Sequence, residues 1–256
     1  PRSRATDAKK NALKPWLKQM WCLPGAPSAE FVCAMEDVLD VYTRPYDPKH
    51  PLVCVDESSK QLVGEVQEPL PTAPGKPARF DHHFVRNGVA NLFMLLEPLV
   101  GHCQVKVTER RTKRDWAFVM RDLVDHHYPE ADAITLVMDN LSTHQKAALY
   151  EVFPPEEAKR IADKIHIHFT PKRGSWLNIA EIGLNVLYRQ CLDRRISTIQ
   201  QLGKEVKAWL KLSEHFALGA VIPVGLHQPA NGARNFLVGN VRVSVAGGGK
   251  IFLSAK

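Results

Sequence analysis

Three acidic residues, far apart along the chain, have the types and settings from which a metal site is built. Asp56 and Asp139 each follow a short apolar run that is typical of a buried strand. Glu181 lies within residues 176–194, which have largely apolar, helical spacing. Because adjacent strands lie ~4.8 Å apart, carboxylates from neighbouring strands can share one divalent ion. We therefore expect an acidic cluster that holds divalent metal.

Such a cluster depends on its metal. Two carboxylates 4 Å apart repel each other by roughly 4 kcal/mol at an effective dielectric constant of 20. Two Mg²⁺ ions ~3.5–4 Å apart turn this repulsion into coordination, and they assist the attacking and leaving oxygens of phosphoryl transfer. Each aspartate alone has an ordinary alternative role as a strand-end turn or helix cap, since Asp139 precedes a predicted helix. The metal-site interpretation therefore depends on all three acids together.

The segment that carries Glu181 has one narrow polar stripe. At helical spacing, Asn178, Glu181, Asn185 and Tyr188 share a face, whereas most of the surrounding residues are apolar. A solvated helix face would more often carry lysine and glutamate. We interpret the stripe as facing a site, with an exposed surface glutamate as the alternative.

The composition is that of a basic globular protein. With 256 residues, 45% of them hydrophobic, the chain can bury a large core. The net charge of +7 and the pI of about 9.2 favour a polyanionic partner, although charge alone is weak evidence for nucleic acid. The five cysteines include no Cys-x-x-Cys pair, which indicates free thiols in a reducing compartment. No apolar run approaches ~18 residues, so no membrane span is expected.

The hydrophobic periodicity predicts strands first and then alternating helices and strands. Residues 29–42 read as an amphipathic helix, and residues 67–80 as a proline-rich loop. The remaining expected strands are 52–56, 90–96, 103–108, 134–139 and 165–170, and the remaining expected helices are 113–127, 142–150, one opening at Pro154-Pro155, 176–194 and 198–212. This order predicts an α/β domain with a mixed sheet.

Three ordered motifs resemble those of a known family. Val55-Asp56-Glu57-Ser58, Met138-Asp139-Asn140-Leu141-Ser142-Thr143-His144 and Gly174-Ser175-Trp176-Leu177-Asn178-Ile179-Ala180-Glu181 are similar to the three acidic motifs of DDE transposases. The similarity is greatest to the mariner-related branch of bacterial insertion sequences, and it extends from about residue 10 to about residue 212. The resemblance implies a ribonuclease-H-like mixed sheet flanked by helices, with a helical N-terminal segment.

The resemblance also implies a reaction and its participants. It implies Mg²⁺-dependent cleavage of double-stranded DNA at the ends of an element, followed by joining of the freed 3′-hydroxyl to target DNA at a TA-containing site. Asp56, Asp139 and Glu181 would hold two Mg²⁺ ions, for which Mn²⁺ can substitute. The implied partners are transposon ends and target DNA, with a homodimer on DNA as one assembly that the family allows. The implied location is the bacterial cytoplasm, in association with the nucleoid.

The same resemblance divides the chain into three parts. Residues 1–50 are expected to form a basic helical linker segment, with the family's upstream helix-turn-helix region absent. Residues 51–215 are expected to form the catalytic domain. Residues 216–256 read as an atypical, loop-rich tail, in which residues 241–245 and 251–253 can pair as a hairpin.

Basic and polar residues near these motifs are the expected DNA contacts. Such residues position DNA by holding its phosphates rather than by reading its sequence. For the basic stretch after residue 105, a solvated charged face is the alternative. The expected contacts are Lys106, Arg110, Arg111, Lys113, Arg114, His144, Lys172, Arg173 and Asn178. His82 and His83 are expected to be surface residues.

A catalytically impaired remnant that only binds DNA is the alternative function. It is favoured by Gly183, two residues after the third motif, where relatives usually carry glutamate, by the expected absence of the upstream region and by the atypical tail. A general ribonuclease-H-like nuclease is a third interpretation, which the text of the motifs disfavours.

Overall fold

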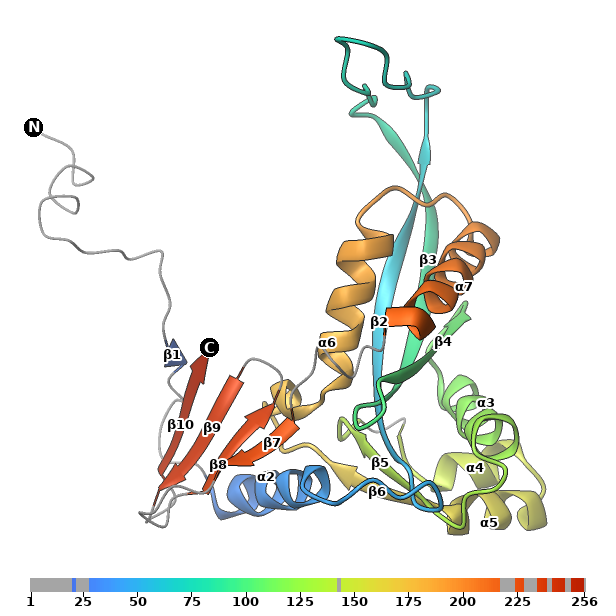
Figure 1. Ribbon diagram of the computed structural model, residues 1–256. Coiled ribbons are helices and arrows are strands. Elements are labelled where there is room, and N and C mark those ends of the chain that lie inside the picture. The colour runs from blue at the N-terminus through green and yellow to red at the C-terminus, as the bar shows by residue number, and fades with distance from the viewer. Residues whose placement is uncertain are drawn as a thin grey trace, which may run out of the picture.

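The computed structural model describes residues 28–141 and 144–212 with their side chains, and the backbone of 20–21, 213–216, 224–227, 234–238, 241–246 and 250–255. A five-stranded sheet with the order β4-β3-β2-β5-β6 lies at the centre (Figure 1). Its strands are β2 (Leu52–Glu65), β3 (Phe84–Glu97), β4 (His102–Thr108), β5 (Ile134–Met138) and β6 (Ile165–Phe169). β2, β3 and β4 are antiparallel, whereas β5 and β6 join in parallel. The predicted mixed sheet is confirmed.

Helices cover both faces of this sheet, because successive strand residues point to opposite sides. On one side, α2 (Ala29–Tyr42), α6 (Ala180–Leu187) and α7 (Ile199–Phe216) share a core with Leu52 and Cys54. On the other side, α3 (Lys113–Asp122), α4 (Ala147–Val152) and α5 (Pro155–Lys164) share a core with Val53 and Val55. The α/β architecture expected from the sequence is therefore present.

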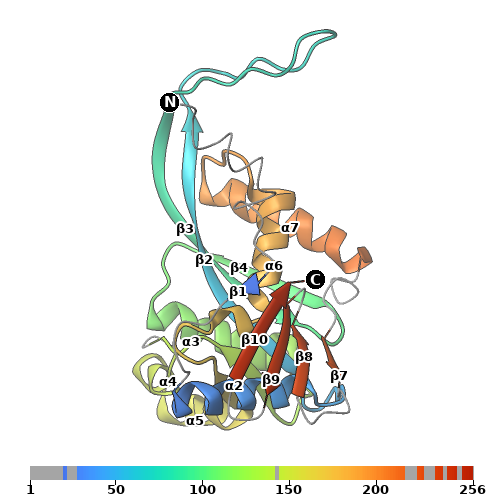
Figure 2. The same cartoon turned by 90° about the vertical axis from the view of Figure 1, so that its left-hand side faces the viewer.

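β2 and β3 continue beyond the core as a long hairpin, which Figures 1 and 2 show projecting past the helices. We call residues 61–89 the arm. Residues 84–89 of β3, which belong to the arm, are exposed, whereas residues 90–97 of the same strand are buried in the core. These strands were expected at 52–56 and 90–96, because hydrophobic patterning reports only their buried parts, and backbone pairing continues where burial stops. Residues 66–83 connect the two strands. They include residues 67–80, which were predicted to form a proline-rich loop.

Several predicted helices differ at their ends. α2 has the predicted bounds, with the Ser28 hydroxyl accepting the Phe31 N–H at 3.2 Å as its N-cap. The predicted helix at 113–127 is α3 followed by a π-helical turn, Leu123–His127. The helix predicted at 142–150 begins only at Ala147, and its first two residues lie outside the described part of the chain. The predicted helix at 176–194 is divided into a 3₁₀ turn (Ser175–Leu177), α6 and a π-helical turn (Tyr188–Leu192).

The interpretation of residues 216–256 as a loop-rich tail is wrong. This region holds β7 (Val224–His227), β8 (Arg234–Val238), β9 (Val241–Ala246) and β10 (Lys250–Ala255), which form an antiparallel sheet with β1 (Met20–Trp21). The predicted hairpin is present as the β9–β10 pair. The rest of the predicted helical segment before residue 28 lies outside the described residues. No helix in the described part has both the length and the apolar character to cross a membrane.

Candidate functional site

Asp56 and Asp139 lie side by side where β5 ends. β2 and β5 run parallel with Val55 opposite Met138, so the next residue on each is an aspartate. Because Cys54 packs on the side of α2 and α6, alternation places the Asp56 side chain on that same side. The expectation that Asp56 ends a strand is wrong, since β2 continues beside β3 with Met94 opposite Asp56. The strand that ends here is the neighbour, β5.

Asn178 fixes the start of the helix that carries Glu181. Its Nδ2 donates a hydrogen bond to the Val55 carbonyl at 2.7 Å, and its Oδ1 accepts the Ala180 N–H at 3.2 Å. One buried side chain therefore joins the first turn of α6 to the strand that carries Asp56. Asn178 is only 1% exposed, so its prediction as a DNA contact is wrong. Its extended backbone also separates the 3₁₀ turn from α6.

Tyr42, the last residue of α2, holds the same segment from the other side. Its hydroxyl donates to the Leu177 carbonyl at 2.7 Å and accepts the Ile179 N–H at 3.4 Å. Burial raises the pKa of Tyr42 well above its ordinary value, so the hydroxyl stays neutral and keeps its proton. Sequence reasoning missed this residue, because it reads only as the apolar end of an amphipathic helix.

The acidic residues interact electrostatically. Burial raises the pKa of Asp56 to about 7, with repulsion from the carboxylates of Asp139, Glu181 and Glu57 acting in the same direction. The Glu57 N–H, which donates to Asp56 Oδ1 at 2.8 Å, acts in the opposite direction. Thr170, another residue that sequence reasoning missed, donates its hydroxyl to Asp139 Oδ1 at 3.0 Å. The fold therefore brings together the three predicted acids, whose mutual repulsion a cation would relieve.

The donors suit a hard divalent cation, because all three are carboxylates and Mg²⁺ prefers oxygen ligands. Within the described part of the chain, ligand oxygens of Asp56, Asp139 and Glu181 do not all lie within 4.8 Å of one another. The three acids are thus neighbours, but their oxygens do not all surround one point as the ligands of a single ion would. Burial raises the pKa of the nearby Cys54 thiol to about 12.

Replacing Asp56 with asparagine should stabilise the metal-free protein at high pH. The pKa of Asp56 is 3.8 in the unfolded chain and about 7 in the fold, so the folded state holds the proton more tightly. Wild-type stability is then highest below about pH 4 and falls as the pH rises to about 7. We expect Asp56→Asn to raise the free energy of unfolding by roughly 2–4 kcal/mol at pH 8 and by little at pH 4. Urea unfolding with a chelator measures both values, and an equal change at the two pH values would contradict the assignment.

Glu57 and His144 form a buried pair on the opposite side of the sheet from Asp56. His144 Nε2 lies 2.7 Å from Glu57 Oε1, and its Nδ1 lies 3.1 Å from the Asp139 carbonyl. Both partners accept hydrogen bonds, so the ring carries a proton on each nitrogen when Glu57 is ionised. Burial lowers the pKa of His144, but the hydrogen bond and charge of Glu57 outweigh it and raise that pKa. The ring also stacks on Trp116, with centroids 6.1 Å apart.

This pair corrects one prediction and supplies a missed residue. His144 is 1% exposed and uses both ring nitrogens internally, so its prediction as a DNA contact is wrong. Instead it connects the backbone of Asp139 to the residue beside Asp56. Glu57 is part of the first acidic motif, and its alternation with Asp56 is the sequence signal that would have placed it on the opposite face.

Lys172 and Arg173 lie next to the site. Both are exposed, and they line a pocket of about 550 Å³ together with Asn140, Thr170 and the first turns of α2. Asn140 follows Asp139 directly. The pocket is connected to the acidic residues through Thr170, whose hydroxyl donates to Asp139, and its lining carries two basic residues and one acidic residue, Glu30.

The other predicted DNA contacts lie in β4, in the first turn of α3 and in the segment between them. Lys106 forms an ion pair with Asp122, and Lys113 pairs with Glu151 at 2.9 Å, so part of their charge is compensated. The three arginines of this stretch are exposed. These are Arg110, Arg111 and Arg114.

Two glycines allow close packing in α6 and in the turn that precedes it. A Cβ on buried Gly183 would lie 3.4–3.5 Å from Leu96 and Met94, in ordinary contact, so this residue packs α6 against β3. A Cβ on Gly174 would lie 2.5 Å from Pro171 Cγ and 3.0 Å from the Pro171 carbonyl, and both are too close. Gly174 is therefore required in the turn that precedes Asn178.

Replacing Gly174 with alanine should destabilise the fold by roughly 1–3 kcal/mol, because the turn must open to admit the methyl group. The matched control is Gly203→Ala in α7, where a Cβ meets nothing within 4 Å. That change should be neutral or stabilise by up to about 1 kcal/mol, since alanine favours a helix over glycine. Denaturant unfolding of both variants provides the measurement, and a Gly174→Ala variant as stable as wild type would refute the steric argument.

Comparisons with known proteins agree with this architecture. The family model for DDE superfamily endonucleases matches residues 51–203. Two similar solved structures are the Mos1 mariner paired-end complex with Mn (TM-score 0.52, covering 86% of this chain and 70% of that chain) and the Mos1 transposase paired-end complex with left transposon end (0.54, 84% and 66%). The Mos1 strand transfer complex is also similar (0.53, 83% and 65%), and all three are 14% identical to this chain. This identity shows a shared fold alone.

The chain spans about two thirds of the length of these solved relatives. A search of curated proteins gave no match. The family model nevertheless covers more than half of the chain, including all three acidic motifs. The resemblance seen in those motifs is thereby confirmed, and the chain belongs to the DDE superfamily endonuclease family.

Proposed function

We propose that this chain is the catalytic core of a DNA transposase, which cleaves DNA strands and transfers the freed 3′ end to a target. The observation that carries the proposal is the convergence of Asp56, Asp139 and Glu181 from two strands and a helix. Burial raises the pKa of Asp56 to about 7, and repulsion from Asp139 and Glu181 acts in the same direction. A pocket lined by Lys172 and Arg173 next to these acids supports a phosphate-bearing substrate.

Asp56, Asp139 and Glu181 are the proposed ligands of two Mg²⁺ or Mn²⁺ ions. Bound metal would neutralise the carboxylates and stabilise charge on the attacking and leaving oxygens of the phosphodiester. A pair of ions shared among the acids suits three carboxylates that are neighbours but do not close around one point. Such chemistry requires no covalent intermediate with the protein.

The surrounding residues hold this arrangement in place. Asn178 and Tyr42 fix the start of α6, and thereby the position of Glu181. Thr170 orients one oxygen of Asp139 through its hydroxyl. Preorganised ligands of this kind do not have to be ordered again during the reaction.

Lys172 and Arg173 are the proposed phosphate contacts closest to the site. Arg110, Arg111 and Arg114, with the ion-paired Lys106 and Lys113, form a second proposed contact surface. The substrate would be double-stranded DNA of transposon ends and target. Two copies of the chain on paired DNA ends are the proposed assembly, since the Mos1 relatives are described as paired-end complexes.

The test is cleavage and strand transfer by the wild-type chain. Supercoiled plasmid and labelled duplexes are incubated with Mg²⁺, Mn²⁺ or a chelator. Nicked plasmid and joined duplexes that require the metal are the expected products. DNA binding with steep salt dependence, but without cleavage in either metal and without millimolar Mg²⁺ affinity, would overturn the proposal in favour of a binding-only remnant.

A further inference from the structure

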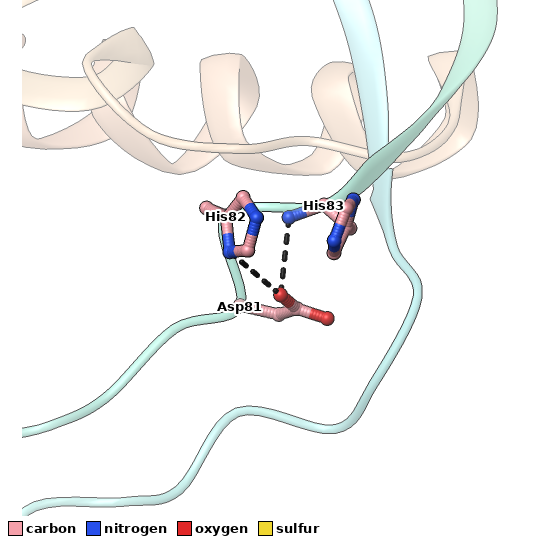
Figure 3. Close-up of side chains that lie close together, drawn as sticks. All are labelled: Asp81, His82 and His83. Carbon is pink, nitrogen blue, oxygen red and sulfur yellow. Dashed lines mark hydrogen bonds and ion pairs between the residues drawn. The ribbon is translucent and has the colours of Figure 1, made fainter.

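Asp81, His82 and His83 gather their side chains at the end of the 66–83 connection, immediately before β3 (Figure 3). One ligand atom from each residue lies within 4.8 Å of the other two. Among the residues that the structure describes, no other trio of histidine, cysteine, aspartate or glutamate does so. This cluster lies outside the acidic site and has no part in the proposed reaction.

A turn brings these three consecutive residues together. In an extended strand, neighbouring side chains would point to opposite sides. Here the His83 N–H donates to Asp81 Oδ1 at 3.1 Å, and His82 Nδ1 lies 3.4 Å from the same oxygen. The two imidazole rings lie 4.0 Å apart between centroids. Figure 3 shows both contacts meeting at one carboxylate oxygen of Asp81.

Arg195 anchors the turn to the rest of the domain. Its Nη1 donates to the His83 carbonyl at 3.4 Å and forms an ion pair with Glu65 at the end of β2. Its guanidinium also lies 5.6 Å from the centroid of the Phe84 ring. Of the ligands, the His82 side chain is 87% exposed, whereas that of Asp81 is 16% exposed. The cluster is thus attached on one side and open to solvent on the other.

The sequence contains a second copy of the same tripeptide, Asp125-His126-His127, which provides an internal comparison. There the backbone is a π-helical turn and the three side chains are not gathered into such a cluster. Asp125 is also engaged by the Arg160 guanidinium, through contacts of 2.6 and 3.0 Å. The conformation, rather than the residue types, distinguishes the first copy.

We propose that Asp81, His82 and His83 form a second metal site, for Zn²⁺ or a similar transition-metal ion. Two imidazoles and one carboxylate are a donor set that Zn²⁺, Ni²⁺ and Cu²⁺ prefer, whereas Mg²⁺ prefers oxygen ligands alone. Three protein ligands leave a fourth position open to water or to a donor from another molecule. A bound ion would hold the end of the 66–83 connection in place where it leads into β3.

The test is calorimetric titration of Zn²⁺ into the full chain carrying Asp139→Asn, which weakens competition from the acidic site. We expect His82→Ala and His83→Ala each to reduce the Zn²⁺ affinity at least about tenfold. His126→Ala, in the matched tripeptide, should leave it unchanged. X-ray absorption at the zinc edge should show imidazole scattering that weakens in His82→Ala.

No Zn²⁺ binding, or equal losses from His82→Ala and His126→Ala, would overturn this assignment. Because His82 is almost fully exposed, its replacement leaves no buried gap. The titration uses neither DNA nor catalysis. Its outcome is therefore independent of whether the chain proves to be a transposase.

Discussion

Asp139→Asn is expected to reduce metal-dependent DNA cleavage by at least about 10³-fold, which corresponds to roughly 4 kcal/mol of lost transition-state stabilisation. The amide has nearly the same shape but lacks the negative charge that a divalent ion requires. Its oxygen can still accept the Thr170 hydroxyl, which lies 3.0 Å from Asp139 Oδ1. The variant should therefore fold normally but lose metal-dependent DNA cleavage. The rate of plasmid nicking in Mg²⁺ is the measurement.

The matched control for this variant is Asp132→Asn. Asp132 is exposed and precedes β5, whereas Asp139 follows it, so the two aspartates flank the same strand at opposite ends. Asp132→Asn should cleave DNA at the wild-type rate. Unchanged cleavage by Asp139→Asn, with both variants folded, would exclude Asp139 from the site.

His144→Ala is expected to destabilise the protein by roughly 3–5 kcal/mol, because it leaves the buried Glu57 carboxylate without its partner. The side chains of His144 and Glu57 are only 2% and 5% exposed, so water cannot replace the lost contact without opening the core. The Asp139 carbonyl loses its donor at the same time. Urea unfolding at pH 7 measures the loss.

A double variant separates an unpaired charge from a simple loss of volume. Glu57→Met combined with His144→Leu removes both polar groups while keeping their approximate size. Because replacing a complete buried pair by apolar residues is often close to neutral, the double variant should be more stable than His144→Ala alone. A double variant as unstable as the single one would show that packing, rather than the ion pair, is what His144 contributes.

The three acids could be predicted from the sequence because each lies in a local signal. Apolar runs preceded Asp56 and Asp139, and parallel pairing of those runs was sufficient to place the two side by side. Glu181 was marked by the apolar helix around it. Each of these apolar segments spans only a few residues, and hydrophobic periodicity detects segments of this kind well.

The residues that support the acids could not be predicted in the same way. Tyr42 and Asn178 act through hydrogen bonds to backbone groups far along the chain, and no periodicity encodes such contacts. The expected helix from residue 176 was wrong at its start because the buried Asn178 side chain begins α6 later. His144 was assigned to DNA because histidine near a metal motif suggests exposure, whereas the fold buries it against Trp116.

The arm and the C-terminal strands illustrate a second limit. In β3, residues before residue 90 are exposed, but the strand already begins at Phe84. Exposed pairing leaves no alternating pattern, so the expected strands were too short. The glycine and proline residues after Phe216 favoured a loop-rich interpretation, but β7, β8, β9 and β10 in this region pair with one another.

The most direct test of the central claim is anomalous diffraction at the manganese edge from crystals soaked in Mn²⁺. We expect Mn²⁺ bound by carboxylate oxygens of Asp56 and Asp139, with Glu181 also contacting an ion in the same site. Binding at the Asp81 cluster would not count toward this result. Mn²⁺ absent from the three acids at millimolar concentration, or bound with Glu181 directed away from every ion, would contradict the account.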